Sequence, residues 1–84
     1  MALVANTVVV GDSWTLITSN VAAVQFNDEM FATVTFGDTP TEVAGFTYKE
    51  GEVYVNGASH LYVWAKKKPG GSNVESVRVL EEVV

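Results

Sequence analysis

The stretch MFATVTFGDTPTEVAGFTYKEGEVYVNG, residues 30–57, decides the fold class. It contains three short runs rich in valine, threonine and aromatic residues, and each run ends in residues that turn a chain. These turn clusters lie at residues 37–40, 50–51 and 56–57. Glycine and asparagine tolerate a positive φ, proline presets φ, and aspartate caps its own turn. Short apolar runs separated in this way are typical of β-strands.

The rest of the 84-residue chain repeats this pattern. It has 16 valines but only four leucines, and β-branched side chains favour a pleated surface over a helical core. No window shows helical periodicity. We expect one all-β domain over residues 1–84, a small sandwich, jelly roll or barrel of about seven to eight short antiparallel strands. The predicted strands are residues 7–10, 13–18, 21–26, 30–36, 45–48, 52–55, 59–66 and 74–81.

Asn56 and Gly57 form a strong hairpin signal between the predicted strands 52–55 and 59–66. A two-residue loop would put the valines of the first strand on the same face as the aromatic residues of the second. A three-residue loop with Gly57 in a bulge would separate aliphatic from aromatic and polar side chains. We favour this second register because it segregates the two classes better. It predicts one aromatic stripe formed by Tyr54, Tyr62 and Trp64.

Composition argues against several kinds of function. Ten acidic residues against five basic ones give a net charge of −5, whereas binding to nucleic acid requires a basic footprint. No cysteine is present, and the only histidine, His60, has no catalytic partner at a suggestive spacing. The acidic residues of the predicted turns come from separate loops and are explained by turn capping. We therefore expect no enzymatic activity, no cofactor and no metal site; the acidic residues considered were Asp12, Asp28, Glu29 and Asp38.

The sequence predicts no membrane partner. The first residues lack the basic region of a signal peptide, and no apolar stretch approaches the roughly 20 residues that span a bilayer. We expect synthesis in the cytoplasm, with any later location reached by assembly. A domain this small buries little surface and has no disulfide, so we also expect it to form a homo-oligomer.

Two groups of residues are candidates for a protein interface. Lys66, Lys67 and Lys68 carry three of the five positive charges. A solvated hairpin tip explains them slightly better than docking onto an acidic protein surface. The predicted aromatic stripe has three interpretations: a platform for sugar rings, a subunit interface or a core layer. Burial is the favoured interpretation; the candidate interface residues are Tyr54, Tyr62, Trp64, Lys66, Lys67 and Lys68.

Four stretches of the chain together resemble the small all-β structural proteins of tailed bacteriophages. They are VVVGDSWTLIT (8–18), GDTPTEVAGFTYKEGE (37–52), LYVWAK (61–66) and VRVLEE (77–82). The resemblance implies a head decoration (cement) or head-fibre-base protein in the virion, which binds and stabilises the phage head. It also implies the major capsid protein or another virion protein as partner, and a trimer as the preferred oligomer. The alternative function is a carbohydrate-binding β-sandwich module with an aromatic platform.

Overall fold

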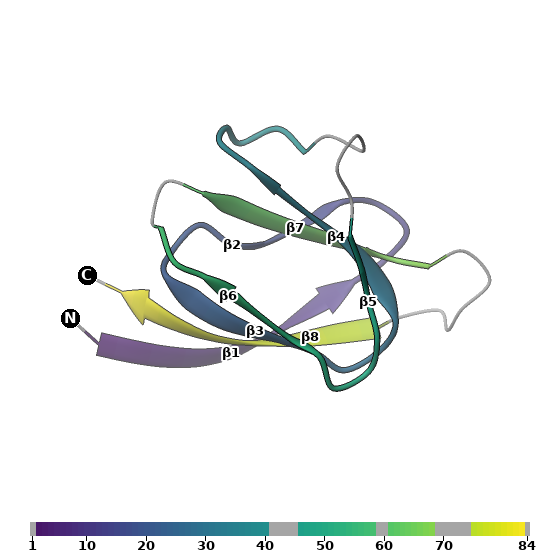
Figure 1. The fold of residues 1–84 in the computed structure, drawn as a ribbon, viewed down its shortest axis with the longest axis horizontal. Helices are drawn as coiled ribbons and strands as arrows, with labels where there is room; N and C mark the ends of the chain where they lie inside the picture. The colour runs from purple at the N-terminus through teal and green to yellow at the C-terminus, as the bar shows by residue number, and fades with distance from the viewer. Residues whose placement is uncertain (1, 41–45, 59–60, 69–74, 84) are drawn as a thin grey trace.

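Eight strands and no helices make up the computed structural model, which describes residues 2–40, 46–58, 61–68 and 75–83 (Figure 1). The prediction of an all-β fold is confirmed. The strands are β1 (Ala2–Val10), β2 (Thr15–Thr18), β3 (Ala22–Phe26), β4 (Met30–Thr35), β5 (Phe46–Tyr48), β6 (Val53–Asn56), β7 (Tyr62–Lys67) and β8 (Glu75–Val83). None of these described segments is a helix that could span a membrane.

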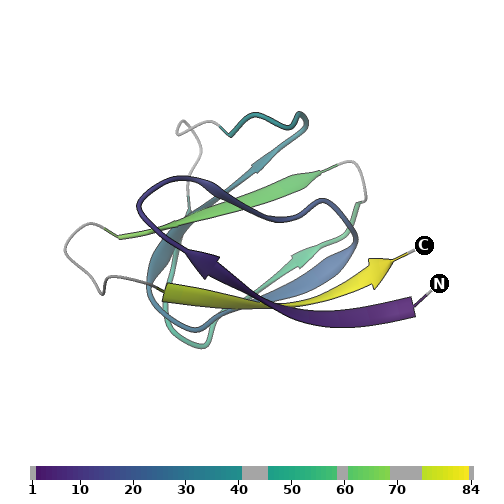
Figure 2. The same ribbon diagram turned by 180° about the vertical axis from the view of Figure 1, so that it is seen from behind.

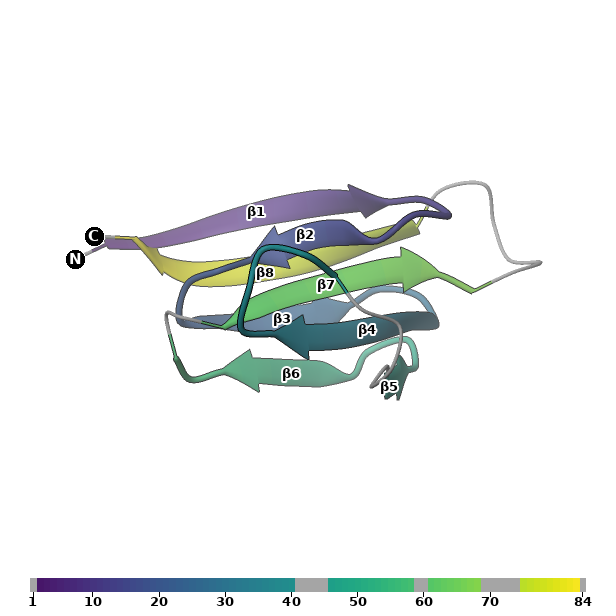
Figure 3. The same ribbon diagram turned by 90° about the horizontal axis from the view of Figure 1, so that it is seen from above.

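The strands form two four-stranded antiparallel sheets that are stacked as a sandwich. Sheet A has the order β1-β8-β3-β6, and sheet B has the order β2-β7-β4-β5. Figure 1 shows the two sheets as layers, with β7 of sheet B above β8 of sheet A, and Figure 3 shows sheet B in front. Each sheet therefore has an inner face that meets the other sheet and an outer face that is turned away from it.

The core consists of the side chains that alternate onto the two inner faces. Sheet A contributes valines from three strands together with Phe26, whose ring stacks on Tyr48 of sheet B at 4.3 Å between centroids. Sheet B contributes Met30, two β-branched residues and two alanines. The fully or nearly fully buried members are Val10, Ile17, Ala22, Val24, Phe26, Met30, Ala32, Val63, Ala65, Val77 and Val79.

The first and last strands form a long ribbon. β1 pairs with β8 over nine residues, from Ala2 opposite Val83 to Val10 opposite Glu75. The first strand was predicted to begin at residue 7, so the prediction was too short by five residues. Pairing with β8 extends it, and Figures 1 and 2 show this ribbon running side by side to the two termini.

The predicted hairpin at Asn56 and Gly57 was wrong. β6 lies in sheet A and β7 lies in sheet B, so these residues carry the chain from one sheet to the other. Among the described residues only Gly51 has a positive φ, at 88°, and Gly57 therefore does not have the backbone that a tight hairpin requires. Asn56 is buried instead, and its Nδ2 donates hydrogen bonds to the carbonyl oxygens of Asn20 (2.9 Å) and Leu61 (3.3 Å).

We expect Asn56→Asp to lower the free energy of unfolding by about 1–3 kcal/mol, because a carboxylate cannot donate the two buried hydrogen bonds. Gly57→Ala is the matched control, since open space surrounds this glycine and its φ is not positive. Urea unfolding of both variants measures the difference. A large loss of stability in Gly57→Ala with little change in Asn56→Asp would instead support the tight hairpin.

Candidate functional site

The outer face of sheet A carries exposed apolar side chains, although it is turned away from the core. A row of four neighbouring side chains crosses all four strands: Ala5, Leu80, Ala23 and Val55. Of these, Leu80 is 45% exposed and Val55 is 67% exposed. We use "outer face of sheet A" for the side chains that share this orientation: Leu3, Ala5, Thr7, Val9, Ala23, Gln25, Val53, Val55, Ser76, Arg78, Leu80 and Glu82.

A shallow hollow of about 590 Å³ lies over this face. Its walls come from all four strands of sheet A, which are β1, β8, β3 and β6. Arg78 is its only charged residue, and it faces solvent beside Gln25 and Thr7. The lining residues are Ala5, Asn6, Thr7, Ala23, Gln25, Val53, Arg78, Val79 and Leu80. A hollow lined by aliphatic side chains, three uncharged polar ones and one guanidinium suits a protein partner that offers apolar side chains and a carboxylate.

Sequence reasoning missed this face. It expected Val53 and Val55 to lie on the aliphatic side of a hairpin, but both side chains point to solvent and Tyr54 points to the core. In β6 one alternating set is Val53 and Val55 and the other is Tyr54 and Asn56, so the hydrophobic pattern alone points to the valines as the inner set. Position in the sheet decides otherwise: Tyr54 packs edge-on against Tyr48, at 6.2 Å between ring centroids.

The aromatic candidates therefore separate into two places. Tyr62 and Trp64 lie on the outer face of sheet B, with their rings stacked at 6.5 Å and 18°, whereas Tyr54 belongs to sheet A. Trp64 is only 8% exposed, and its Nε1 donates a 2.9 Å hydrogen bond to Oγ1 of Thr35 on the adjacent strand β4. The predicted stripe of three aromatics was wrong, because its register depended on the hairpin. Burial of Trp64 is confirmed.

The lysine run is held by three separate contacts. Nζ of Lys66 lies 4.8 Å from the ring centroid of Trp14. Nζ of Lys67 lies 3.0 Å from an Asp12 carboxylate oxygen, and the Lys67 side chain is only 10% exposed.

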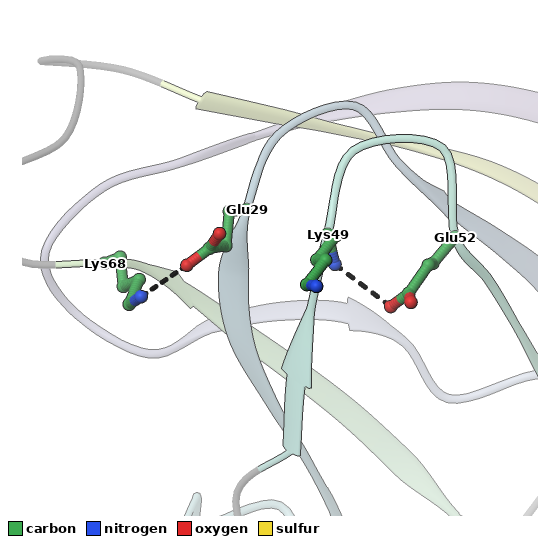
Figure 4. Close-up of polar contacts among 4 residues, drawn as sticks. All are labelled: Glu29, Lys49, Glu52 and Lys68. Atoms are coloured by element: carbon green, nitrogen blue, oxygen red, sulfur yellow. Dashed lines mark hydrogen bonds and ion pairs between the residues drawn. The ribbon is translucent and has the colours of Figure 1, made fainter.

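Lys68 pairs with Glu29, which is shown in Figure 4 beside the backbone hydrogen bond from Lys49 to the Glu52 carboxylate. The prediction of a solvated tip was wrong for Lys67, whose side chain is nearly buried, whereas Lys68 is exposed and pairs with Glu29 at the surface. The rest of that predicted tip, residues 69–71, lies outside the described residues, as does His60.

The acidic side chains near this end of the sandwich differ in their environment. Hydrogen bonding to Lys68 and its charge lower the pKa of Glu29. Burial, and then the negative charge of Asp28, raise the pKa of Glu75, whose Oε2 has no hydrogen-bond partner among the described residues. Within that part of the chain, no group of three or more acidic or histidine side chains is placed to hold a metal ion.

Comparison of the chain with models of known families, with curated proteins and with solved structures found no match. The function is therefore inferred from the surfaces of the sandwich. The outer face of sheet A is the strongest candidate, because its apolar side chains are exposed, whereas Trp64 and Lys67 are engaged within the fold.

We expect Trp64→Ala to lower the free energy of unfolding by about 3–5 kcal/mol, because it removes a large buried side chain. Trp64→Phe keeps most of the apolar area but loses the hydrogen bond to Thr35, so its cost is about 1 kcal/mol for that bond plus a smaller packing loss. Thermal and urea unfolding measure both. A melting temperature for Trp64→Ala within a few degrees of the wild type would contradict the structural role of this residue.

The buried Glu75 makes stability depend on pH. Its pKa is raised in the folded state, so the folded protein binds more protons than the unfolded chain between the two pKa values, and stability falls as pH rises through that window. We expect Glu75→Gln to be more stable than the wild type at neutral pH and nearly equal to it below about pH 4. Urea unfolding between these limits checks this, with the exposed Glu50→Gln as control. A stability difference that does not change with pH would contradict it.

Proposed function

We propose that this protein is a non-catalytic structural subunit that attaches to a larger protein assembly through the outer face of sheet A. The form implied by the resemblance is a capsid decoration or cement subunit of the virion, which binds the major capsid protein or another virion protein. The observation that carries the proposal is the exposed apolar row from Ala5 to Val55 across sheet A.

The chemistry of this face supports attachment to protein. A contiguous exposed apolar surface costs free energy in water, and proteins retain such surfaces where a partner covers them. Arg78 stands within the apolar hollow and has no ion-pair partner among the described residues. Arginine is enriched in protein interfaces and forms bidentate hydrogen bonds with carboxylates. The proposed partner surface is therefore apolar, with an acidic side chain opposite Arg78.

In a decoration role, many copies of the subunit bind one particle through this face. Each subunit that binds the assembled shell but not its separated components stabilises the assembled state by mass action. Many weak attachments on one particle add up, so a shallow face on an 84-residue subunit suffices. Such a subunit needs no catalytic group, metal or cofactor.

Carbohydrate binding is less well supported by the positions of the aromatic side chains. A platform for sugars needs ring faces that are open to solvent. Tyr54 packs against the core, Trp64 is nearly buried, and the outer face of sheet A carries no aromatic side chain. Two of the three residues considered for the platform, Tyr54 and Trp64, therefore serve the fold, and Tyr62 is a single partly exposed ring on the outer face of sheet B.

Mass spectrometry of purified particles from the source of this chain tests the proposal directly. A capsid decoration protein is present in some hundreds of copies on a particle, in proportion to its major capsid protein. Absence of the chain from particles, or a handful of copies as in a tail component, would overturn the decoration role.

We expect Leu80→Glu to abolish attachment to shells that lack the protein, because it places a carboxylate in the centre of the apolar row. Leu16→Glu is the matched control: it makes the same change at 42% exposure on the outer face of sheet B. Co-sedimentation measures attachment, and circular dichroism confirms that both variants are folded. Equal attachment of Leu80→Glu and the wild type would contradict the assignment of this face.

A further inference from the structure

The sandwich has four edge strands, and three of them are short. β6 and β2 contain four residues each and β5 contains three, whereas β1 contains nine. β2 is also interrupted by a register shift between Leu16 and Thr18. Short or irregular edges discourage pairing with other chains, so three of the edges are protected by their own geometry.

β1 has none of the usual protections of an edge strand. Its sequence, ALVANTVVV, contains no charged residue and no proline, and its pairing with β8 runs through nine residues without a register shift. No described strand pairs with its other side. A long, regular, uncharged edge exposes a row of backbone N–H and C=O groups that can pair with another strand.

We propose that two copies of this chain pair along β1, antiparallel to each other about a two-fold axis at Asn6. All nine residues of β1 then find a partner, because Asn6 is the middle of the strand Ala2–Val10. Ala5 lies opposite the second copy's Thr7, Leu3 opposite its Val9, Val4 opposite its Val8 and Ala2 opposite its Val10. About eight to ten new backbone hydrogen bonds form, as in any antiparallel pair of this length.

The register of the strands favours a second copy as the occupant of this edge, because it opposes no like charges. Each chain carries a net charge of −5, so two copies repel each other at long range. A stable contact between them must therefore avoid placing like charges opposite each other. Extending the known β1–β8 register across the two-fold axis gives rows of β8, β1, β1 and β8. No row contains two charged residues: Glu82 shares its row with the second copy's Ser76, Glu81 with its Val77, Arg78 with its Leu80, and Glu75 with its Val83.

Strand length favours the β1–β1 pair over a head-to-tail arrangement. Pairing β1 with β6 of another copy would match nine residues with four and leave most of the long edge open. The symmetric pair instead closes both long edges and joins the two A sheets into one sheet of eight strands. The outer faces of both copies then lie side by side, and this doubles the surface proposed for docking. The dimer itself does not depend on that docking.

The first test uses charges at the two-fold axis. Asn6 is exposed, so Asn6→Lys and Asn6→Glu remain folded as single chains, which circular dichroism checks. Light scattering and analytical ultracentrifugation should give a two-chain mass for the wild type. In each variant alone the dissociation constant of the dimer should rise roughly tenfold or more, because like charges then face each other directly. Mixing the two variants in equal amounts should restore a dimer that contains one copy of each.

A monomeric wild type, a trimer, or unchanged affinity in both variants would overturn the two-fold pairing. A trimer would leave the attachment role intact, so the two proposals fail independently.

The second test checks the register and does not depend on the charge variants. The chain has no cysteine, so Asn6→Cys introduces a single thiol at the axis. Directly opposed residues of paired strands lie within the distance that a disulfide bridges. Mild oxidation should therefore cross-link Asn6→Cys into a covalent dimer. Val53→Cys, on the exposed opposite edge of sheet A, is the control and should remain uncross-linked. Equal cross-linking of both variants, or of neither, would contradict the proposed axis.

Discussion

A two-layer sandwich buries only one face of each sheet, and this constraint determines the rest of the molecule. Side chains alternate between the faces of a strand, so a chain that is 48% hydrophobic has more apolar side chains than two inner faces can hold. β8 illustrates the consequence: Val77 and Val79 point into the core, while the next residue, Leu80, points to the outer face and is exposed to solvent. Part of the excess apolar surface lies on the outer face of sheet A, which carries the exposed Leu3, Val9, Val53, Val55 and Leu80.

The outer faces of the two sheets carry different kinds of side chain. In sheet B the indole of Trp64 covers the adjacent strand and is fixed by Thr35, and Lys66 lies over Trp14. In sheet A no aromatic side chain of the described strands lies on the outer face, and its central row consists of Ala5, Leu80, Ala23 and Val55. The long open edge β1 belongs to the same sheet. Both features that favour association thus lie on sheet A, while the lysines of β7 are held by contacts inside the fold.

The sequence predicts fold class well because strand alternation and turn residues are local signals. The positions of β3 and β4 follow from them almost to the residue. The partner of each strand is not local. Asn56 and Gly57 have the composition of a hairpin, yet the burial of Asn56 between two loops makes them a crossing between sheets. The predicted aromatic stripe was wrong for the same reason, because the face on which Tyr54 was placed depended on that one connection.

Amide hydrogen exchange at low and high protein concentration tests most directly whether sheet A is the surface through which this protein associates. The account predicts that amides of β1 exchange more slowly at high concentration, because pairing with a second copy protects them. Amides of β2 and β5, at the edges of sheet B, should not change. Protection that grows with concentration in sheet B and leaves β1 unaffected would contradict the account.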